Sequence, residues 1–124
     1  MKSTELRIGN LVKTYSLHIG DYYTVVSIGN SFINRDSVLI YEDLHPIPLT
    51  EEWLLKFGFS IINENSAGKR YGYVIGGVFN SGLTFTFWKT TKEAGKFFRG
   101  DLELKSVHQL QNLYFALTNN ELTL

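Results

Sequence analysis

The 124-residue sequence predicts an α+β fold, and three features support this prediction. Short segments rich in β-branched and aromatic residues recur in both halves of the chain, as is typical of antiparallel sheets. Residues 50–57 have helix signals at both ends, and residues 107–118 have the apolar periodicity of an amphipathic helix. Hydrophobic residues make up 44% of the chain, which is enough to form a buried core.

The N-terminal part, residues 1–48, is expected to form a small β-barrel-like lobe. Its predicted strands are residues 6–13, 22–28, 32–33 and 37–41. Gly29, Asn30 and Ser31 are a turn signal between two of these strands. Short strands at close spacing, joined by polar turns, are typical of small curled sheets and barrels. The chain length suits either two lobes that share a core or one compact domain.

A short linking helix is predicted over residues 50–57. Thr50 is a good N-cap, and Glu51 and Glu52 lie where the helix dipole favours negative charge. Gly58 fits the position after the last helical residue, where a left-handed backbone conformation ends many helices. The helix is therefore specified at both of its ends.

The second part, residues 49–124, is expected to add an antiparallel sheet packed by a C-terminal helix. Its predicted strands are residues 59–62, 71–79, 83–88 and 97–104, with a polar loop over residues 63–70. The second and third of these strands flank Asn80, Ser81 and Gly82, which together predict a hairpin turn.

The C-terminal helix has polar residues and one large aromatic ring outside its apolar stripe. Ser106 is its predicted N-cap, and Gln109 completes a capping box. The stripe comprises Val107, Leu110, Leu113, Tyr114 and Leu117. His108, Gln111, Asn112 and Phe115 lie off the stripe. A ring among polar side chains indicates either a second packing face, in the core or in a homo-oligomer, or a docking surface. These four residues are therefore candidate protein-contact residues.

Composition excludes several classes of function. Twelve basic and twelve acidic residues cancel, which argues against nonspecific binding to nucleic acid. The chain has no cysteine, which excludes disulfides and thiolate chemistry and fits a reducing compartment. Residues 1–10 lack the apolar region of a signal peptide, and no apolar run approaches the roughly 18 residues of a membrane-spanning helix. We therefore expect a cytoplasmic protein without a membrane partner.

The sequence shows no catalytic or metal-binding pattern. His18, His45 and His108 are far apart, and none has a second ligand-type residue at the spacing of a zinc pair. Glu51 and Glu52 are adjacent, so on a helix their side chains point about 100° apart and suit the helix dipole better than acid–base catalysis. We therefore expect a non-enzymatic protein with no metal and no cofactor.

One basic cluster is interleaved with aromatic residues. Its members are Trp88, Lys89, Lys92, Lys96, Phe97, Phe98 and Arg99. Such a cluster can hold single-stranded nucleic acid through phosphate contacts and base stacking. The aromatic residues are equally suited to filling a core. Trp88, Lys89, Lys92, Lys96 and Arg99 are therefore candidate nucleic-acid contacts.

Three blocks of the sequence resemble known proteins. RIGNLV (residues 7–12), PIPLTEEWLLKFGF (46–59) and VHQLQNLYFALT (107–118) occur in this order in small uncharacterised proteins of anaerobic gut bacteria and their phages. This resemblance implies a phage or mobile-element context and brings no activity with it. Separately, Gly9 to Val12 and residues 23–28 make the first lobe similar to SH3-like small barrels of the KOW or Tudor kind.

These observations predict a non-enzymatic, phage-derived or mobile-element accessory protein that acts through protein–protein contacts. Its partner is either another protein, whose identity the sequence leaves open, or a second copy of the chain. The alternative is a nucleic-acid-binding module that uses the face of the β-barrel or the basic loop of residues 89–99.

Overall fold

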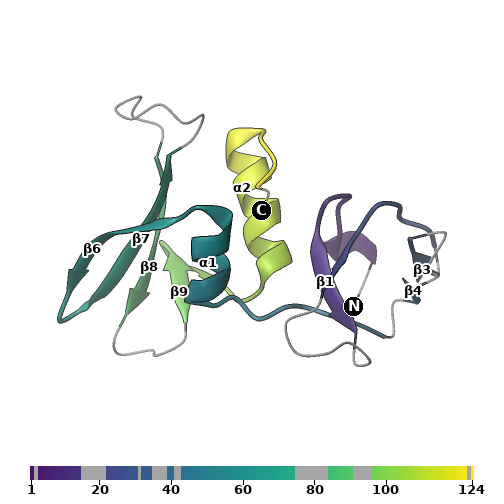
Figure 1. Ribbon diagram of the computed structural model, residues 1–124, viewed down its shortest axis with the longest axis horizontal. Helices are drawn as coiled ribbons and strands as arrows, with labels where there is room; N and C mark the ends of the chain where they lie inside the picture. The colour runs from purple at the N-terminus through teal and green to yellow at the C-terminus, as the bar shows by residue number, and fades with distance from the viewer. Residues whose placement is uncertain are drawn as a thin grey trace.

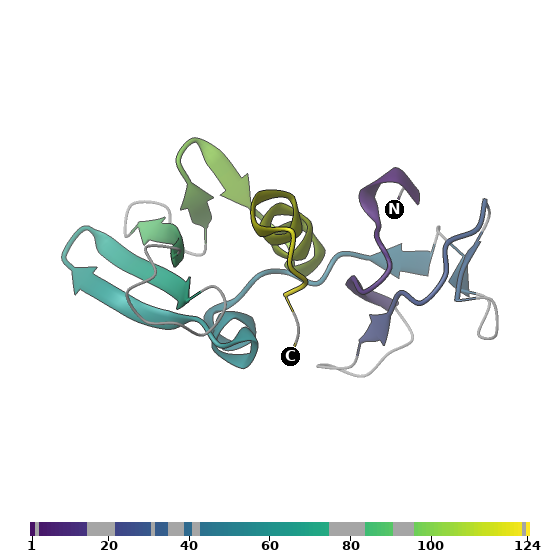
Figure 2. The same ribbon diagram turned by 90° about the horizontal axis from the view of Figure 1, so that it is seen from above.

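Two β-rich parts of the protein lie at opposite ends of an elongated molecule, with a helix between them (Figures 1 and 2). The computed structural model describes residues 1, 3–14, 22–30, 32–34, 39–40, 43–74, 84–90, 96–122 and 124. In this part of the chain there are two α-helices and several antiparallel sheets, so the predicted α+β class is confirmed.

The N-terminal part contains short strands around one central strand. Its elements are the 3₁₀ helix η1 (Ser3–Glu5) and the strands β1 (Leu11–Thr14), β2 (Tyr23–Thr24), β3 (Phe32–Ile33), β4 (Leu39–Ile40) and β5 (Leu44–His45). The strand order is β2-β1-β5 in a three-stranded sheet, and β3 pairs with β4. Over the described residues these strands do not close into a barrel.

The second part is a five-stranded antiparallel sheet with two helices. Its elements are α1 (Glu51–Phe57), β6 (Ser60–Asn65), β7 (Gly68–Val74), β8 (Thr84–Thr90), β9 (Phe97–Arg99), β10 (Leu102–Leu104) and α2 (Val107–Thr118). The strand order is β10-β9-β8-β7-β6. Helix α2 lies between this sheet and the N-terminal strands (Figure 2).

Strand β1 lies between two apolar clusters and contributes to both, because successive side chains of a strand point to opposite faces. Leu11 joins the larger cluster, which includes Trp53, Leu54, Tyr71, Phe97, Leu110 and Tyr114. The next residue, Val12, joins a smaller cluster with Leu6, Val25, Ile33 and Leu44. The predicted boundary at residue 48 lies in the extended segment between β5 and α1.

Both ends of α1 match the prediction from sequence. The hydroxyl of Thr50 accepts a hydrogen bond from the Trp53 amide at 3.4 Å. Gly58 has a φ of 96°, in the left-handed region, and the amide of Phe59 donates to the Leu54 carbonyl at 3.0 Å. These contacts satisfy backbone groups that a helix end otherwise leaves unpaired.

The predicted polar loop over residues 63–70 is wrong, because these residues form a hairpin. Strand β6 ends at Asn65 and β7 begins at Gly68, so only two residues lie between the two strands. The side-chain oxygen of Asn65 accepts hydrogen bonds from the amides of Ala67 (2.8 Å) and Gly68 (3.2 Å), which fixes the turn. An exposed edge strand has no apolar face to bury, so its composition resembles that of a loop.

Three smaller predictions also differ from the structure. The first strand begins at Leu11 rather than residue 6, because Gly9 (φ 97°) turns the chain. The predicted strand 97–104 is a hairpin, β9 and β10, bent at Gly100 (φ 61°). Leu117, predicted in the core stripe, is 53% exposed because the large cluster covers α2 only as far as Tyr114. The predicted hairpin turn at residues 80–82 lies outside the described residues.

Replacing Thr50 by Ala is expected to destabilise the protein by about 1 kcal/mol, because the Trp53 amide loses its cap. Urea denaturation of the wild type and the variant measures this difference. Thr50→Ser keeps the hydroxyl and is the matched control, so it should retain most of the stability that Thr50→Ala loses. Equal losses in the two variants would show that the hydroxyl does not cap α1.

Candidate functional site

The polar face of α2 contacts the N-terminal part of the same chain, and Gln111 is at the centre of this contact. Gln111 is 2% exposed. Its Oε1 accepts the amide of Leu11 at 2.9 Å, and its Nε2 donates to the carbonyl of Gly9 at 3.1 Å. Nε2 also lies 3.4 Å from the carbonyl of Leu122 near the C-terminus. One amide side chain therefore joins the start of β1, α2 and the C-terminal segment.

Asn112 makes a second set of contacts beside Gln111. Its Oδ1 accepts from Nδ2 of Asn10 at 2.8 Å and from a guanidinium nitrogen of Arg7 at 3.3 Å. Its Nδ2 donates to the carbonyl of Glu5 at 2.9 Å. The side chain of Asn10 in turn accepts the amide of Arg7 at 2.7 Å, which holds the turn before β1.

Phe115 also contacts the N-terminal part. The guanidinium carbon of Arg7 lies 3.8 Å from the centroid of the Phe115 ring, in cation–π geometry. Arg7 forms an ion pair with Glu121 as well. The ring is half-buried under this arginine. Three of the four candidate protein-contact residues therefore contact the N-terminal part of the same chain, although Asn112 and Phe115 keep part of their surface in solvent.

His108, the fourth candidate, lies in the first turn of α2 and is 7% exposed. Its Nδ1 is 3.3 Å from the hydroxyl of Ser106, the residue that caps this helix. Burial lowers the pKa of the His108 imidazole, and the negative charge of Glu5 acts in the opposite direction. His108 is therefore close to an acidic side chain of the N-terminal part.

A cleft of about 500 Å³ opens beside His108, where the N-terminal part, the extended segment before α1 and the start of α2 meet. Its lining residues are Glu5, Pro46, Pro48, Lys105, Ser106, His108, Gln109 and Asn112. Several of their polar groups already have partners: Gln109, for example, accepts from the Lys105 amide at 2.8 Å and donates to the Glu103 carbonyl at 2.9 Å. A volume of this size falls within the range of ligand-binding clefts.

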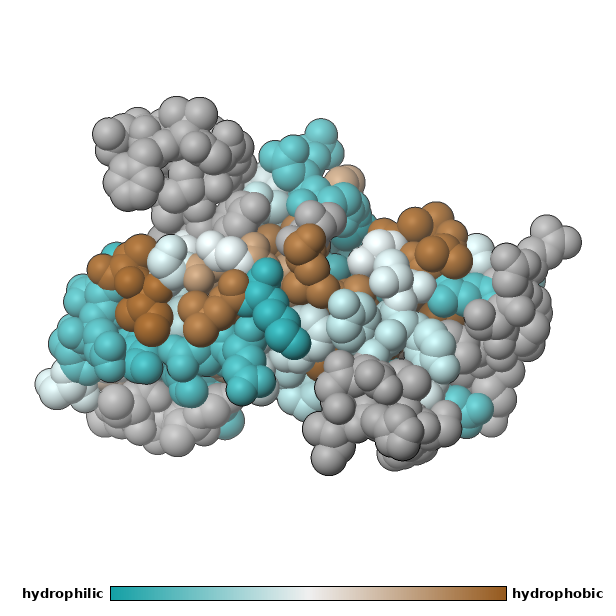
Figure 3. Space-filling model, in the orientation of Figure 1, coloured by the Kyte–Doolittle hydropathy of each residue, from teal (hydrophilic) through white to brown (hydrophobic). Residues whose placement is uncertain are grey.

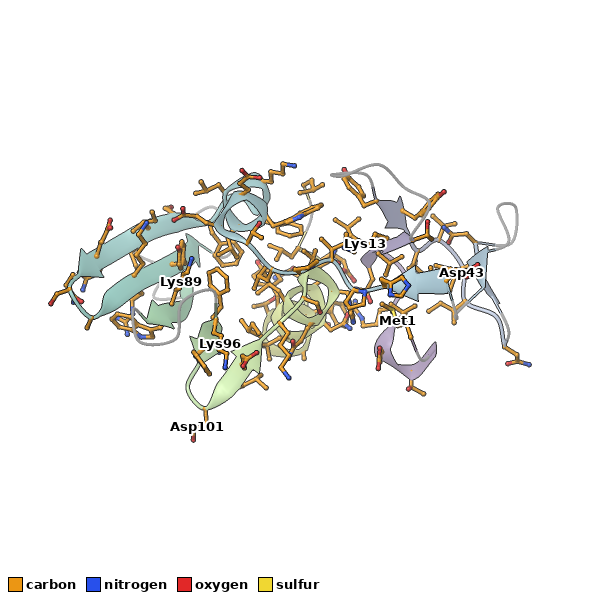
Figure 4. The ribbon with its side chains drawn as sticks, turned by 90° about the horizontal axis from the view of Figure 1, so that it is seen from below. Met1, Lys13, Asp43, Lys89, Lys96 and Asp101 are labelled. Carbon is orange, nitrogen blue, oxygen red and sulfur yellow. The ribbon has the colours of Figure 1, made fainter. Side chains whose placement is uncertain are left out.

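The structure divides the candidate nucleic-acid residues between two faces of the five-stranded sheet. Trp88 pairs with Phe98, and Lys89 pairs with Phe97, so each pair shares a face. Phe97 is in the large core cluster, which places Lys89 and also Arg99, two residues further along, on the inner face. Figure 4 shows Lys89 and Lys96 at the sheet, away from Lys13 and Asp43 in the N-terminal part.

Trp88, Lys89 and Lys96 of this basic cluster each contact another side chain of the protein. Lys89 Nζ lies 5.2 Å from the centroid of the Phe97 ring. Lys96 Nζ lies 4.0 Å from the carboxylate of Glu103, which pairs with Phe98 on the outer face. Arg70 lies over the Trp88 ring, 4.3 Å from its centroid. Lys92 lies outside the described residues.

Glu51 has a role that the sequence did not reveal. Its Oε1 accepts the hydroxyl of Tyr71 at 2.9 Å and lies 3.4 Å from Nζ of Lys69. The hydrogen bond from Tyr71 lowers the pKa of Glu51, whereas burial and the same bond raise the pKa of Tyr71. This contact ties the start of α1 to the inner face of β7.

Comparison with protein-family models, with curated proteins and with solved structures finds no match to this chain. Among the described residues, no three His, Asp or Glu side chains form a group that could hold a metal ion. Neither helix in the described part of the chain has the length and apolar character needed to span a membrane.

Replacing Gln111 by Met is expected to lower the free energy of unfolding by about 1–3 kcal/mol for each buried backbone group left without a partner. The buried group is the Leu11 amide, and the partly buried Gly9 carbonyl loses its bond as well. Urea denaturation measures the loss. Leu117→Ala, on the exposed part of the same helix, should change stability by less than about 0.5 kcal/mol. Comparable losses in the two variants would contradict the assigned role of Gln111.

The stability of the protein is expected to fall as the pH is lowered through about 6.5, the ordinary pKa of histidine. Burial lowers the pKa of His108 in the folded state, so the unfolded state takes up the proton first. Unfolding free energies between about pH 7.5 and about pH 5.5 measure the slope. His108→Gln should reduce it. The lowered pKa of Glu51 keeps its titration below this window, so an unchanged slope in the variant would contradict the assignment to His108.

Proposed function

We propose that the protein is a non-enzymatic accessory protein that binds an extended segment of another protein in the cleft beside His108. The observation on which this rests is the cleft itself, about 500 Å³ in volume and lined by both parts of the molecule and by α2. Ligand sites occur preferentially at such junctions. Two of the four candidate contact residues, His108 and Asn112, line it.

The hydrogen-bond pattern around His108 indicates what it offers a ligand. The Ser106 side chain is buried, and its oxygen already accepts the amide of Gln109 at 3.3 Å. Its hydroxyl proton needs an acceptor, and Nδ1 of His108 lies 3.3 Å away. A neutral imidazole that accepts at Nδ1 has its proton on Nε2. We therefore assign to His108 a hydrogen-bond donor, Nε2–H, for a ligand in the cleft.

The remaining lining suits a polypeptide better than an ion or a small anion. Lys105 and Glu5, both exposed, place opposite charges at the cleft. A ligand that carries charge of only one sign is therefore repelled by one of them. Pro46 and Pro48, also exposed, supply apolar ring surface. An extended peptide offers carbonyl acceptors to Nε2–H, amide donors to a carboxylate and apolar side chains to the prolines.

The biological setting belongs to the same proposal. The resemblance of residues 7–12, 46–59 and 107–118 to small proteins of gut bacteria and their phages supports a phage or mobile-element origin. The cysteine-free sequence fits the cytoplasm. The SH3-like character of the N-terminal lobe rests on the strand signals around Gly9 and residues 23–28.

Single-stranded nucleic acid is the second candidate ligand, and one observation favours it. Trp88 and Phe98 are cross-strand neighbours on the outer face of the sheet, with Arg70 and Lys96 beside them. Aromatic rings next to cations are the usual platform for stacked bases. Arg70 occupies a face of Trp88, and Glu103 opposes Lys96, so we rank this function below protein binding.

The test of the proposed function is the capture of proteins from a lysate of the cells that encode the chain. Lys105→Glu reverses the charge of an exposed residue in the cleft and should remove at least one protein that the wild type retains. Lys56→Glu makes the same change on the exposed side of α1 and is the matched control. Mass spectrometry of the three eluates gives the comparison.

Identical captures by the wild type and Lys105→Glu would contradict binding at the cleft. Submicromolar binding of a short single strand at physiological salt would instead favour the second candidate, because nonspecific contacts alone reach only about 10⁻⁴ to 10⁻⁶ M.

A further inference from the structure

Strand β6 is an open edge of the five-stranded sheet. It is the last strand in the order β10-β9-β8-β7-β6, and all six of its residues are exposed. Figure 1 shows it at the end of the molecule remote from the N-terminal part. An edge strand directs half of its backbone amides and carbonyls away from the sheet, where they can pair with another strand.

The opposite edge of the sheet is short and partly covered. Strand β10 has only three residues, Leu102–Leu104. Directly after it, the carbonyl of Lys105 accepts the amide of Leu49 at 3.1 Å, and the amide of Val107 donates to the carbonyl of Ile47 at 2.9 Å. The extended segment before α1 therefore lies beside the chain at this edge. Strand β6 is twice as long as β10, and every one of its residues is exposed.

The composition of β6 does not protect this edge. Proteins commonly protect edges with Lys or Pro, and β6, SIINEN, contains neither. Its one charged residue, Glu64, is 3.8 Å from Nζ of Lys69 on the neighbouring strand. Ile61 and Ile62 are 40% and 50% exposed. Figure 3 shows apolar atoms gathered over the β6 end of the sheet.

A bulge at Ile62 places this residue outside the ladder with β7. The register shifts between Ile61 and Asn63, so Ile62 is the extra residue of β6. The extra residue of a bulge is left unpaired in the ladder. An exposed apolar side chain with no opposite residue on β7 therefore lies near the middle of the strand.

We propose that β6 pairs antiparallel with β6 of a second copy of this chain, which joins two five-stranded sheets edge to edge. A two-fold axis at Ile62 sets Ile62 opposite itself, Ile61 opposite Asn63 and Ser60 opposite Glu64. No like charges then face each other, and the Ile62 residues of the two copies meet at the centre, each flanked by Ile61 of its own strand. The formal net charge of the chain is +0, so two copies have no net electrostatic repulsion.

This pairing goes beyond the proposed function, and the two are tested separately. None of the residues that line the cleft belongs to β6. A dimer through β6 therefore predicts that Lys105→Glu leaves self-association unchanged. Failure of either proposal leaves the other standing.

Cysteine cross-linking tests the proposal directly because the chain has no cysteine of its own. Under mild oxidation, Ile62→Cys should form a disulfide-linked dimer at least about tenfold faster than Leu102→Cys, because pairing holds the two sulfurs at high effective concentration. Leu102 is the matched control, since it is 46% exposed on the opposite edge strand. Adding Ile61→Lys to Ile62→Cys should slow the reaction towards the control rate.

Sedimentation of the unmodified protein completes the test. We expect a dimer fraction that rises with protein concentration and that Ile61→Lys diminishes. A wild type that remains monomeric at the highest accessible concentration would overturn the proposal. Equal cross-linking rates for Ile62→Cys and Leu102→Cys would overturn it as well, even if a dimer forms, because the interface would then lie elsewhere.

Discussion

The side-chain amide of Gln111 is the contact on which the arrangement of the two parts depends. It bonds to the backbone where β1 begins, since it accepts the Leu11 amide and donates to the Gly9 carbonyl. Gln111 is 2% exposed, so these backbone groups replace water as its hydrogen-bond partners. Loss of the bond to Leu11 leaves a buried amide unpaired, which costs more than the bond itself contributes. The amide therefore fixes where α2 lies along β1.

The cleft follows from this placement. Asn112 lies one residue beyond Gln111 and binds the Glu5 carbonyl, so η1 lies over the polar face of α2. His108 lies three residues before Gln111, on the same face of the helix, and lines the cleft together with Glu5 of η1. The covalent link through residues 46–49 closes the remaining side, with the Ile47 carbonyl bound to the Val107 amide. The cleft is thus the space left where three segments are held by short polar contacts.

Local signals in the sequence predicted the helices, and long-range contacts limited the rest. The caps of α1 need only neighbouring residues, so Thr50 and Gly58 were predicted correctly. The first half of β6 lies in the predicted strand of residues 59–62, but residues 63–65 were mistaken for a loop because this polar, exposed half shows no alternation of apolar and polar residues.

The contacts of the candidate site were beyond prediction for a different reason. The partners of Gln111 and Asn112 in β1 and the turn before it lie about 100 residues earlier in the chain. Asparagine, glutamine and arginine are common on exposed surfaces, and nothing in their spacing indicates which partner each will bind. The apolar periodicity of residues 107–118 separates His108, Gln111, Asn112 and Phe115 from the core stripe. No such pattern marks Arg7, Asn10 and Glu5, which complete the contact.

The open edge and the cleft lie on different parts of the molecule, and this separation bears on how the protein would act. The edge belongs to β6 at one end, whereas the cleft lies beyond α2, beside the N-terminal part. A two-fold dimer through β6 would leave both clefts open, and each protomer would hold its cleft on the side away from the axis. Two weak sites on one rigid assembly bind a partner with two matching segments far more tightly than one site does. A modest cleft is therefore compatible with strong binding, provided that the partner is itself repetitive or oligomeric.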